Sequence, residues 1–263
     1  SSMVSPSMSP DSLGSETPDL ATVTARVADV EGWMSPGQAS TLYDAARRCP
    51  PGGTIVEIGS FRGRSTIVLA SAAPPDVSVI AIDPHAGNDR GPQEIDGYAD
   101  AAADDHAVFL ANLERAGVAD RVRHVRKFSD EALADVEAPI DVLYIDGAHR
   151  YGPARADIRD WGARVTDGGT MLIHDSFSSI GVTLAILREL LLGSRFRYVG
   201  RSRSMTIYRA DRSGGPGASA RNAGRQLAQL PWFVKNVALK VGLTLGLGKV
   251  LARMGRNVPD WPY

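Results

Sequence analysis

The sequence predicts an α/β fold in which a doubly wound, mostly parallel sheet of seven strands is flanked by helices. Five short apolar runs alternate with helical patterns, which favours parallel strands joined by right-handed crossovers. These runs are 54–59, 77–83, 122–127, 140–146 and 169–175. Two later runs, 195–201 and 204–210, lie too close together for a crossover helix. We therefore expect a hairpin that adds antiparallel strands to the end of the sheet.

Helices are expected between and around these strands. The helical patterns between strands lie near 64–73, 100–116, 129–136, 151–165 and 180–192. Two more helices precede the first strand, at about 20–31 and 37–48, and Ser35 with Pro36 forms a favourable start for the second. Together these elements predict one domain over residues 20–210.

The segments outside this domain differ from it in composition. Residues 1–19 are rich in Ser, Pro and Met, and we expect a disordered leader. No apolar stretch follows a basic one there, so we expect no secretory signal and a cytoplasmic location. The glycine- and serine-containing segment 211–222 indicates a flexible linker before a C-terminal extension, 223–263.

Composition and charge exclude several classes of protein. The chain has 263 residues and a formal net charge of −1, which argues against a nucleic-acid partner. The single cysteine, Cys49, excludes an internal disulfide framework and a cysteine-rich zinc site.

The C-terminal part is nevertheless basic, with eight Arg and Lys residues against Asp211 and Asp260 over 211–263. Its apolar stretch 230–254 carries three lysines and three glycines, which argues against a membrane span. We expect a helix pair that packs on the body or forms the interface of a homodimer. Peripheral contact with a membrane, or docking of an acidic partner, is the alternative.

A glycine-containing turn follows the first predicted strand. Ligands of open parallel sheets bind outside the carboxyl ends of the strands, and Gly59 and Gly63 let the backbone approach a ligand closely. Their spacing differs from the G-x-G-x-x-G pattern of nicotinamide-binding proteins, which disfavours an oxidoreductase. Asp83 ends the second predicted strand, where a carboxylate accepts hydrogen bonds from ribose hydroxyls.

The segment 56–66, VEIGSFRGRST, resembles motif I of the class I S-adenosylmethionine (SAM)-dependent methyltransferases, in the subgroup called methyltransferase family 24. A parallel sheet that ends in antiparallel strands is also typical of that class. The resemblance implies that SAM binds at this turn, with its ribose on Asp83 and its adenine near Ser129. The residues implied in cofactor binding are Glu57, Gly59, Ser60, Gly63, Ser65, Asp83, Ser129 and Asp146.

Asp146 and Asp175 each end one of two neighbouring predicted strands. Both side chains should therefore emerge at the same edge of the sheet, beside the glycine turn. Two ionised carboxylates repel one another unless a cation or a proton lies between them. Oxygen ligands suit Mg²⁺ or another hard divalent cation, so the sequence predicts a metal site here.

The pattern D-G-x-H-x-Y from Asp146, followed by G-G-x-x-x-x-H-D, resembles metal-dependent O-methyltransferases of the same subgroup. Enzymes that act on sugars of macrolide antibiotics and on methylmannose polysaccharides are among them. The resemblance covers about 54–210 and implies Asp146, His174 and Asp175 as metal ligands and His149 as the general base. Imidazole is also a plausible base on chemical grounds, because it titrates near neutral pH.

The sequence thus predicts a SAM-dependent O-methyltransferase with Mg²⁺ or another divalent cation, acting on a hydroxyl of a sugar, an oligosaccharide or a glycosylated metabolite. A metal-independent small-molecule methyltransferase and a non-catalytic SAM-binding protein that docks partners through its basic tail remain as alternatives. The connection 84–99 is expected to form a lid. His85, His106 and His124 lack a supporting motif and are expected to be structural or solvent-facing.

Overall fold

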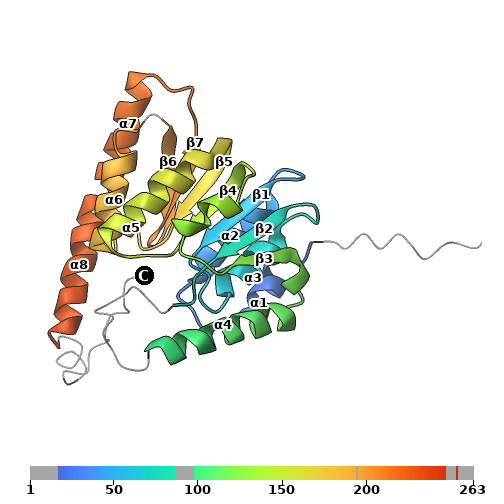
Figure 1. The fold of residues 1–263 in the computed structure, drawn as a ribbon. Coiled ribbons are helices and arrows are strands. Elements are labelled where there is room, and N and C mark those ends of the chain that lie inside the picture. Colours follow the sequence, from blue (N-terminus) through green and yellow to red (C-terminus); the bar gives the residue numbers. More distant parts are fainter. Residues whose placement is uncertain (1–16, 87–97, 194, 247–252, 254–263) are drawn as a thin grey trace, which may run out of the picture.

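The computed structural model describes residues 17–86, 98–193, 195–246 and 253, and the side chains of 98–103 lie outside this description (Figure 1). The expected disordered leader, apart from 17–19, and residues 87–97 of the expected lid also lie outside the described residues.

A seven-stranded sheet forms the centre of the molecule, with strand order β3-β2-β1-β4-β5-β7-β6 (Figure 1). The first five strands pair in parallel, while β7 pairs antiparallel with both β5 and β6. This confirms the predicted fold class and the terminal hairpin. The strands are β1 (Thr54–Ile58), β2 (Ser78–Ile82), β3 (Val122–Val125), β4 (Ile140–Ile145), β5 (Val165–Ile173), β6 (Phe196–Ser202) and β7 (Met205–Ala210).

Helices cover both faces of the sheet because alternate side chains of its strands point in opposite directions. Ile55 of β1 belongs to the apolar cluster beneath one set of helices, and Val56 belongs to the cluster beneath the other. The first set is α1 (Leu20–Arg26), α2 (Pro36–Arg47), α3 (Arg64–Ala72) and α4 (Tyr98–Arg115). The second contains α5 (Tyr151–Ala156) and α6 (Ile180–Leu190).

Local sequence signals account for several helix ends. Ser35 caps α2 through a capping box with Gln38, and Pro36 occupies the first turn, as the sequence predicts. The predicted helix 151–165 begins as α5 and continues as a π-turn over Asp157–Trp161 and a 3₁₀ turn over Gly162–Arg164. The predicted helix 129–136 is a shorter 3₁₀ helix, Glu131–Asp135.

The expected flexible linker 211–222 is wrong over its second half, where α7 (Pro216–Leu227) begins. Asn222 lies against the edge strand β6, where its Oδ1 accepts from Tyr198 N–H at 2.7 Å and its Nδ2 donates to the Phe196 carbonyl at 3.2 Å. The buried amide thus replaces part of a missing strand partner. Glycines at 214, 215 and 217 suggested a linker, but Pro216 starts a helix.

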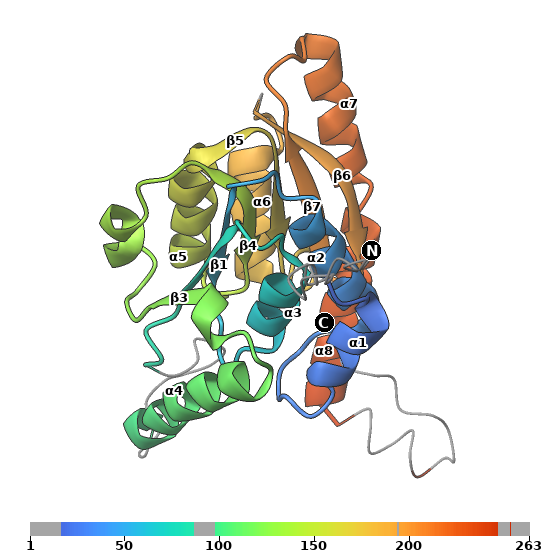
Figure 2. The ribbon, with the colours of Figure 1, turned by 90° about the vertical axis from the view of Figure 1, so that its right-hand side faces the viewer.

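The C-terminal helix α8 (Leu230–Thr244) packs on the body, as one of the two expectations had it. Asn236 Nδ2 donates to the Phe177 carbonyl at 3.1 Å, and Lys240 Nζ donates to Ser178. Arg201 of β6 lies over the ring of Trp232 at 3.8 Å from its centroid. Figure 2 shows α7 and α8 running along the β6 side of the sheet.

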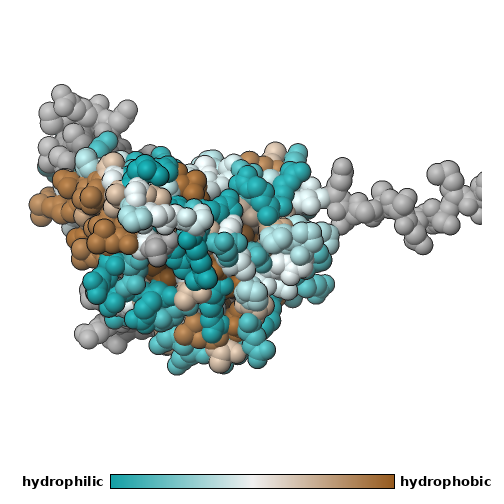
Figure 3. Space-filling model, turned by 90° about the horizontal axis from the view of Figure 1, so that it is seen from above, coloured by the Kyte–Doolittle hydropathy of each residue, from teal (hydrophilic) through white to brown (hydrophobic). Residues whose placement is uncertain are grey.

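Part of this extension presents apolar side chains to solvent. Figure 3 shows an apolar region on the side of the molecule where α6 and α8 lie. Exposed apolar residues of these two helices are Ile180, Leu184, Val234 and Val241, and Leu245 directly after α8 is also exposed. Within the described residues, no helix is both long and apolar enough to cross a membrane. A homodimer interface and peripheral contact with a membrane, both expected for this extension, remain predictions.

We expect Asn222→Ala to lower the free energy of unfolding by about 1–3 kcal/mol, because two buried backbone groups of β6 lose their partners. Urea-induced unfolding measures this change. Arg221→Ala, on the exposed side of the same helix, is the matched control and should stay within about 0.5 kcal/mol of the parent. Equal stabilities of the two variants would contradict the place of α7 in the folded body.

Candidate active site

The hydrogen-bond ladder of the parallel sheet extends one residue beyond the strands and aligns the predicted site residues. Gly59 N–H donates to the Ile82 carbonyl at 2.8 Å, and Asp146 N–H donates to the Ile58 carbonyl at 2.8 Å. His174 N–H donates to the Ile145 carbonyl at 2.9 Å. The predicted convergence of these segments at one edge of the sheet is therefore confirmed.

A cavity of about 630 Å³ lies at this edge. Its wall is made by the turn after β1, the end of β2, the loop between β4 and α5, and the connection between α1 and α2. Of the predicted cofactor residues, those in the wall are Gly59, Ser60, Ser65, Asp83, Ser129 and Asp146. The predicted base, His149, also lines the cavity.

Gly59 and Gly63 hold backbone conformations that their predicted roles require. Gly59 has φ +86°, and a Cβ on it would lie 2.4 Å from the Asp146 carbonyl oxygen. Any side chain there would separate β1 from β4 at the point where their loops meet. Gly63 has φ +88° and precedes the first turn of α3, with the Phe109 ring against it.

Ser60 and Asp83 present polar atoms at the cavity. Asp83 Oδ2 accepts from Phe61 N–H at 2.8 Å, and Oδ1 accepts from His85 N–H at 2.7 Å. These bonds fix the carboxylate while leaving each oxygen a further lone pair. Ser60 Oγ is buried and has no hydrogen-bond partner among the described residues. A buried hydroxyl without a partner indicates a site for a polar ligand group.

Glu57, a predicted cofactor residue, does not line the cavity in the described part of the chain. Its side chain is fully buried and accepts hydrogen bonds from the hydroxyls of Ser65 and Thr66, which tie β1 to the first turn of α3. Burial raises the pKa of Glu57 to about 8, although both hydroxyl contacts act in the opposite direction. Glu57 therefore stabilises the turn between β1 and α3 and does not face the cavity.

Ser129 lines the cavity but does not cap the helix that follows it. Its hydroxyl donates to Asp157, and its carbonyl accepts from Trp161 Nε1–H at 3.1 Å. Asp130 caps the short helix instead. Burial raises the pKa of Asp157 to about 7, with the Ser129 contact opposing the shift. The Ser129 hydroxyl is thus committed to a protein partner.

Asp146, His149 and Asp175 form the acidic end of the site. One potential ligand atom of each lies within 4.8 Å of the other two. His149 Nε2 contacts Asp175 Oδ2, and its Nδ1 is buried without a hydrogen-bond partner among the described residues. The buried Tyr144 hydroxyl lies 3.2 Å from Asp146 Oδ2 and donates to it.

His174 has a different surrounding from that of a metal ligand. Its Nδ1 lies 3.1 Å from Asp146 Oδ1 and 3.3 Å from Asp175 Oδ2. Its Nε2 faces the amide nitrogen of Gln38 at 3.2 Å, and Gln38 Oε1 is already used in accepting from Ser35 N–H. The amide therefore donates to Nε2, which places the proton of a neutral ring on Nδ1.

The neighbouring histidines and carboxylates shift one another's pKa values. Burial acts to lower the pKa of His174, but the carboxylates of Asp146 and Asp175 raise it to about 10. An imidazolium would place a second N–H against the amide nitrogen of Gln38, so this contact opposes the charge that the carboxylates favour. Burial opposes the charge on Asp175, yet His174 and His149 hold its pKa well below the ordinary value. Asp175 also has φ +53°, an uncommon conformation for a non-glycine residue.

Three groups at this site escaped the sequence analysis. Gln38 is identifiable from sequence only as the partner of the Ser35 cap, and its contact with His174 joins residues 136 positions apart. Tyr144 lies in the apolar run of β4, so the sequence alone indicates only a core residue. The cluster of His85, His106 and His124 forms only where α4 packs on the sheet, so the spacing of these residues in the sequence does not indicate it.

The strand order is that of the class I methyltransferase fold of Rossmann-like architecture. Residues 56–176 match the family model Methyltransf_24, described as a methyltransferase domain. This stretch runs from β1 to just beyond β5 and contains every predicted site residue of the chain.

Solved structures share the fold at low sequence identity. Cofactor-bound Rv0187 from MTB is 22% identical, with a TM-score of 0.51 over 77% of this chain and 94% of that one. The O-methyltransferase NovP is 16% identical, with a TM-score of 0.54 over 68% of this chain and 81% of that one. A Corynebacterium glutamicum protein is 12% identical, with a TM-score of 0.55 over 75% of this chain and 92% of that one.

The pKa of Glu57 predicts a specific pH dependence of stability. Because this pKa rises from 4.5 to about 8 on folding, the folded protein holds a proton that the unfolded chain releases between these pH values. Stability from this group therefore falls as pH rises through that window. Glu57→Gln removes the ionisation, so its stability relative to the parent should increase from pH 5 to pH 8 by on the order of a few kcal/mol.

Urea unfolding of parent and variant at the two pH values measures this difference. Glu114→Gln, at an exposed position of α4, is the matched control for removing a carboxyl group. An identical Glu57→Gln effect at pH 5 and pH 8 would show that Glu57 is not held protonated.

Proposed function

We propose that this protein is a SAM-dependent O-methyltransferase whose acceptor is a hydroxyl of a sugar or a glycosylated metabolite. The observation that carries the proposal is one cavity shared by the glycine turn, Asp83 and His149. The matched methyltransferase domain supports the reaction class. The sugar acceptor rests on the sequence resemblance around Asp146 and His149.

SAM fits the nucleoside end of this cavity. Gly59 lines the cavity with bare backbone, and Asp83 retains lone pairs for both ribose hydroxyls. The buried Ser60 hydroxyl offers a donor and an acceptor to the ligand. Asp146 lines the same cavity directly beside the glycine turn, and we propose that it faces the methionine part of SAM.

His149 is the proposed general base. It lines the cavity, whereas Asp175 is buried and contacts its Nε2 from outside the cavity wall. An Nε2–H donated to Asp175 leaves the Nδ1 lone pair free to take a proton from the acceptor hydroxyl. The oxygen then forms a bond to the methyl carbon as the carbon–sulfur bond of SAM breaks, and the proton stays on His149 until it exchanges with solvent.

The carboxylates of Asp146 and Asp175 have the donor chemistry for a divalent cation, since two hard oxygen ligands lie close together. We propose these two residues as ligands and omit His174, because the Gln38 contact on its Nε2 places the proton of the neutral ring on Nδ1. A bound divalent cation lowers the pKa of an alcohol and so supplies a more reactive nucleophile.

A metal-independent methyltransferase is the second candidate. The contact of His149 with Asp175 favours it, because a base oriented by a carboxylate deprotonates a hydroxyl without a cation. A non-catalytic SAM-binding protein is a third reading, in which the His149–Asp175 pair has no chemical task.

We expect the protein to bind S-adenosylhomocysteine in calorimetric titrations and to transfer labelled methyl groups from SAM to members of a panel of glycosides. Treatment with EDTA should reduce the transfer, and Mg²⁺ or Mn²⁺ should restore it, because the cation raises the reactivity of the hydroxyl. Full transfer after exhaustive EDTA would leave the metal-independent candidate. Binding without transfer to any compound would leave the non-catalytic one.

His149→Asn should lower kcat for methyl transfer by about 10²–10⁴-fold, the contribution of a positioned base. S-adenosylhomocysteine affinity should stay near that of the parent, since His149 acts on the acceptor. Tyr151→Phe, two residues further on and exposed, is the matched control and should keep the parental rate. A rate that survives in His149→Asn would remove His149 from the mechanism.

A further inference from the structure

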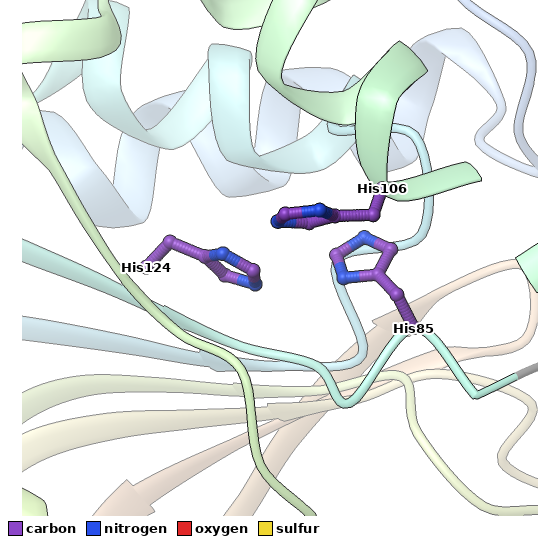
Figure 4. Close-up of side chains that lie close together, drawn as sticks. All are labelled: His85, His106 and His124. Atoms are coloured by element: carbon purple, nitrogen blue, oxygen red, sulfur yellow. The ribbon is translucent and has the colours of Figure 1, made fainter. Parts of the chain in front are cut away.

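Three of the five histidines in the chain lie together at the edge of the sheet, apart from the carboxylates of the proposed active site. His85 follows β2, His106 lies on α4, and His124 lies in β3. One nitrogen of each ring lies within 4.8 Å of those of the other two. Figure 4 shows the three rings converging from these separate elements.

Hydrogen bonds on the far side of two rings fix where their protons lie. His85 Nε2 is 2.7 Å from the Phe61 carbonyl oxygen, which accepts its proton. For His124, a backbone contact with Asp83 acts to raise the pKa, which favours a proton on the nitrogen that faces this backbone. The remaining nitrogens, His85 Nδ1 and His124 Nε2, are buried and have no hydrogen-bond partner among the described residues. Each therefore exposes a lone pair to the interior of the cluster.

Such an arrangement is that of imidazoles prepared to bind a metal. In metal sites the second ring nitrogen usually donates to a carbonyl or carboxylate, which sets the tautomer and orients the ring. Two buried lone pairs without a donor are costly unless a ligand occupies the space between them. The Asp83 carboxylate lies 3.8 Å from His85 Nδ1 and adds a negative charge beside the cluster.

Burial of two of the rings favours the neutral form that coordinates metals. Burial, followed by the neighbouring His85 and His106, lowers the pKa of His124 to about 4. Burial, followed by Arg126, also lowers the pKa of His106. In His106 and His124, the lowered pKa therefore reduces the competition of protons with a metal.

We propose that His85, His106 and His124 form a second cation site, which binds Zn²⁺ or a similar divalent transition metal through three imidazole nitrogens. Imidazole ligands suit zinc, cobalt, nickel and copper rather than Mg²⁺. Zinc–nitrogen bonds of about 2.1 Å place tetrahedral ligand atoms about 3.4 Å apart. The three nitrogens lie within 4.8 Å of one another, so metal binding needs them to approach by at most about 1.4 Å. A water molecule takes the fourth position.

The site has a structural consequence for the proposed cofactor cavity. A metal there links α4 to the ends of β2 and β3, which otherwise meet through aromatic contacts of His85 and His124 with Phe109. His85 also lines the cavity and holds the Phe61 carbonyl in its wall. The bound metal thus stabilises the wall that carries Asp83.

The test is zinc binding by the full-length, tag-free protein after removal of metals, measured by calorimetry and by the visible spectrum of bound Co²⁺. All measurements use an Asp175→Asn background, so that the acidic end of the active site does not contribute. We expect one equivalent of tightly bound zinc, a tetrahedral Co²⁺ spectrum and a higher melting temperature with zinc.

His124→Phe keeps the ring packing against Phe109, and His106→Gln changes a half-buried side chain of α4. Each should weaken zinc binding by at least about tenfold, the loss that even an indirect partner of a ligand causes. Circular dichroism without metal verifies folding, and His106→Gln decides the question should His124→Phe not fold. No zinc binding by the Asp175→Asn protein, or an unchanged zinc affinity in a folded histidine variant, would overturn the proposed site. The three histidines would then form only an aromatic cluster.

Discussion

The register of the parallel strands is the constraint on which the site depends. Each strand places its last residue beside that of its neighbour, so Gly59, Asp83, Asp146 and His174 follow one hydrogen-bonded edge. A shift of one residue between β1 and β4 would turn the site side chains to the opposite face. At position 59 this register leaves no room for a side chain, because a Cβ there would lie 2.4 Å from the Asp146 carbonyl oxygen.

Much of this site follows from sequence because strand ends are visible in sequence. Apolar runs ended by Asp83, Asp146 and Asp175 indicate both the sheet and the edge at which these carboxylates meet. The local pattern does not show in which direction a side chain points or which groups it contacts. Glu57 falls within the matched motif, yet its place in β1 directs it under α3, towards two hydroxyls rather than the cavity.

Contacts between distant segments account for what the sequence could not predict. Asn222 looks like part of a polar linker until the unpaired edge of β6 is seen beside it. His174 resembles a ligand until Gln38 of α2 is found against its second nitrogen. In both cases a single amide, placed by tertiary packing, decides the role, and no periodicity or spacing signals it.

The packing of α8 on the segment after β5 connects the C-terminal helix to the loop that carries Asp175. Phe177 and Ser178, which hold Asn236 and Lys240, follow Asp175 within three residues, and Phe177 also has a positive φ of 53°. One short loop, with positive φ at Asp175 and Phe177, therefore contacts both the proposed active site and the C-terminal helix. By thermodynamic reciprocity, a ligand that alters this loop changes the docking energy of the helix, and a partner that pulls on the helix changes the ligand's affinity equally.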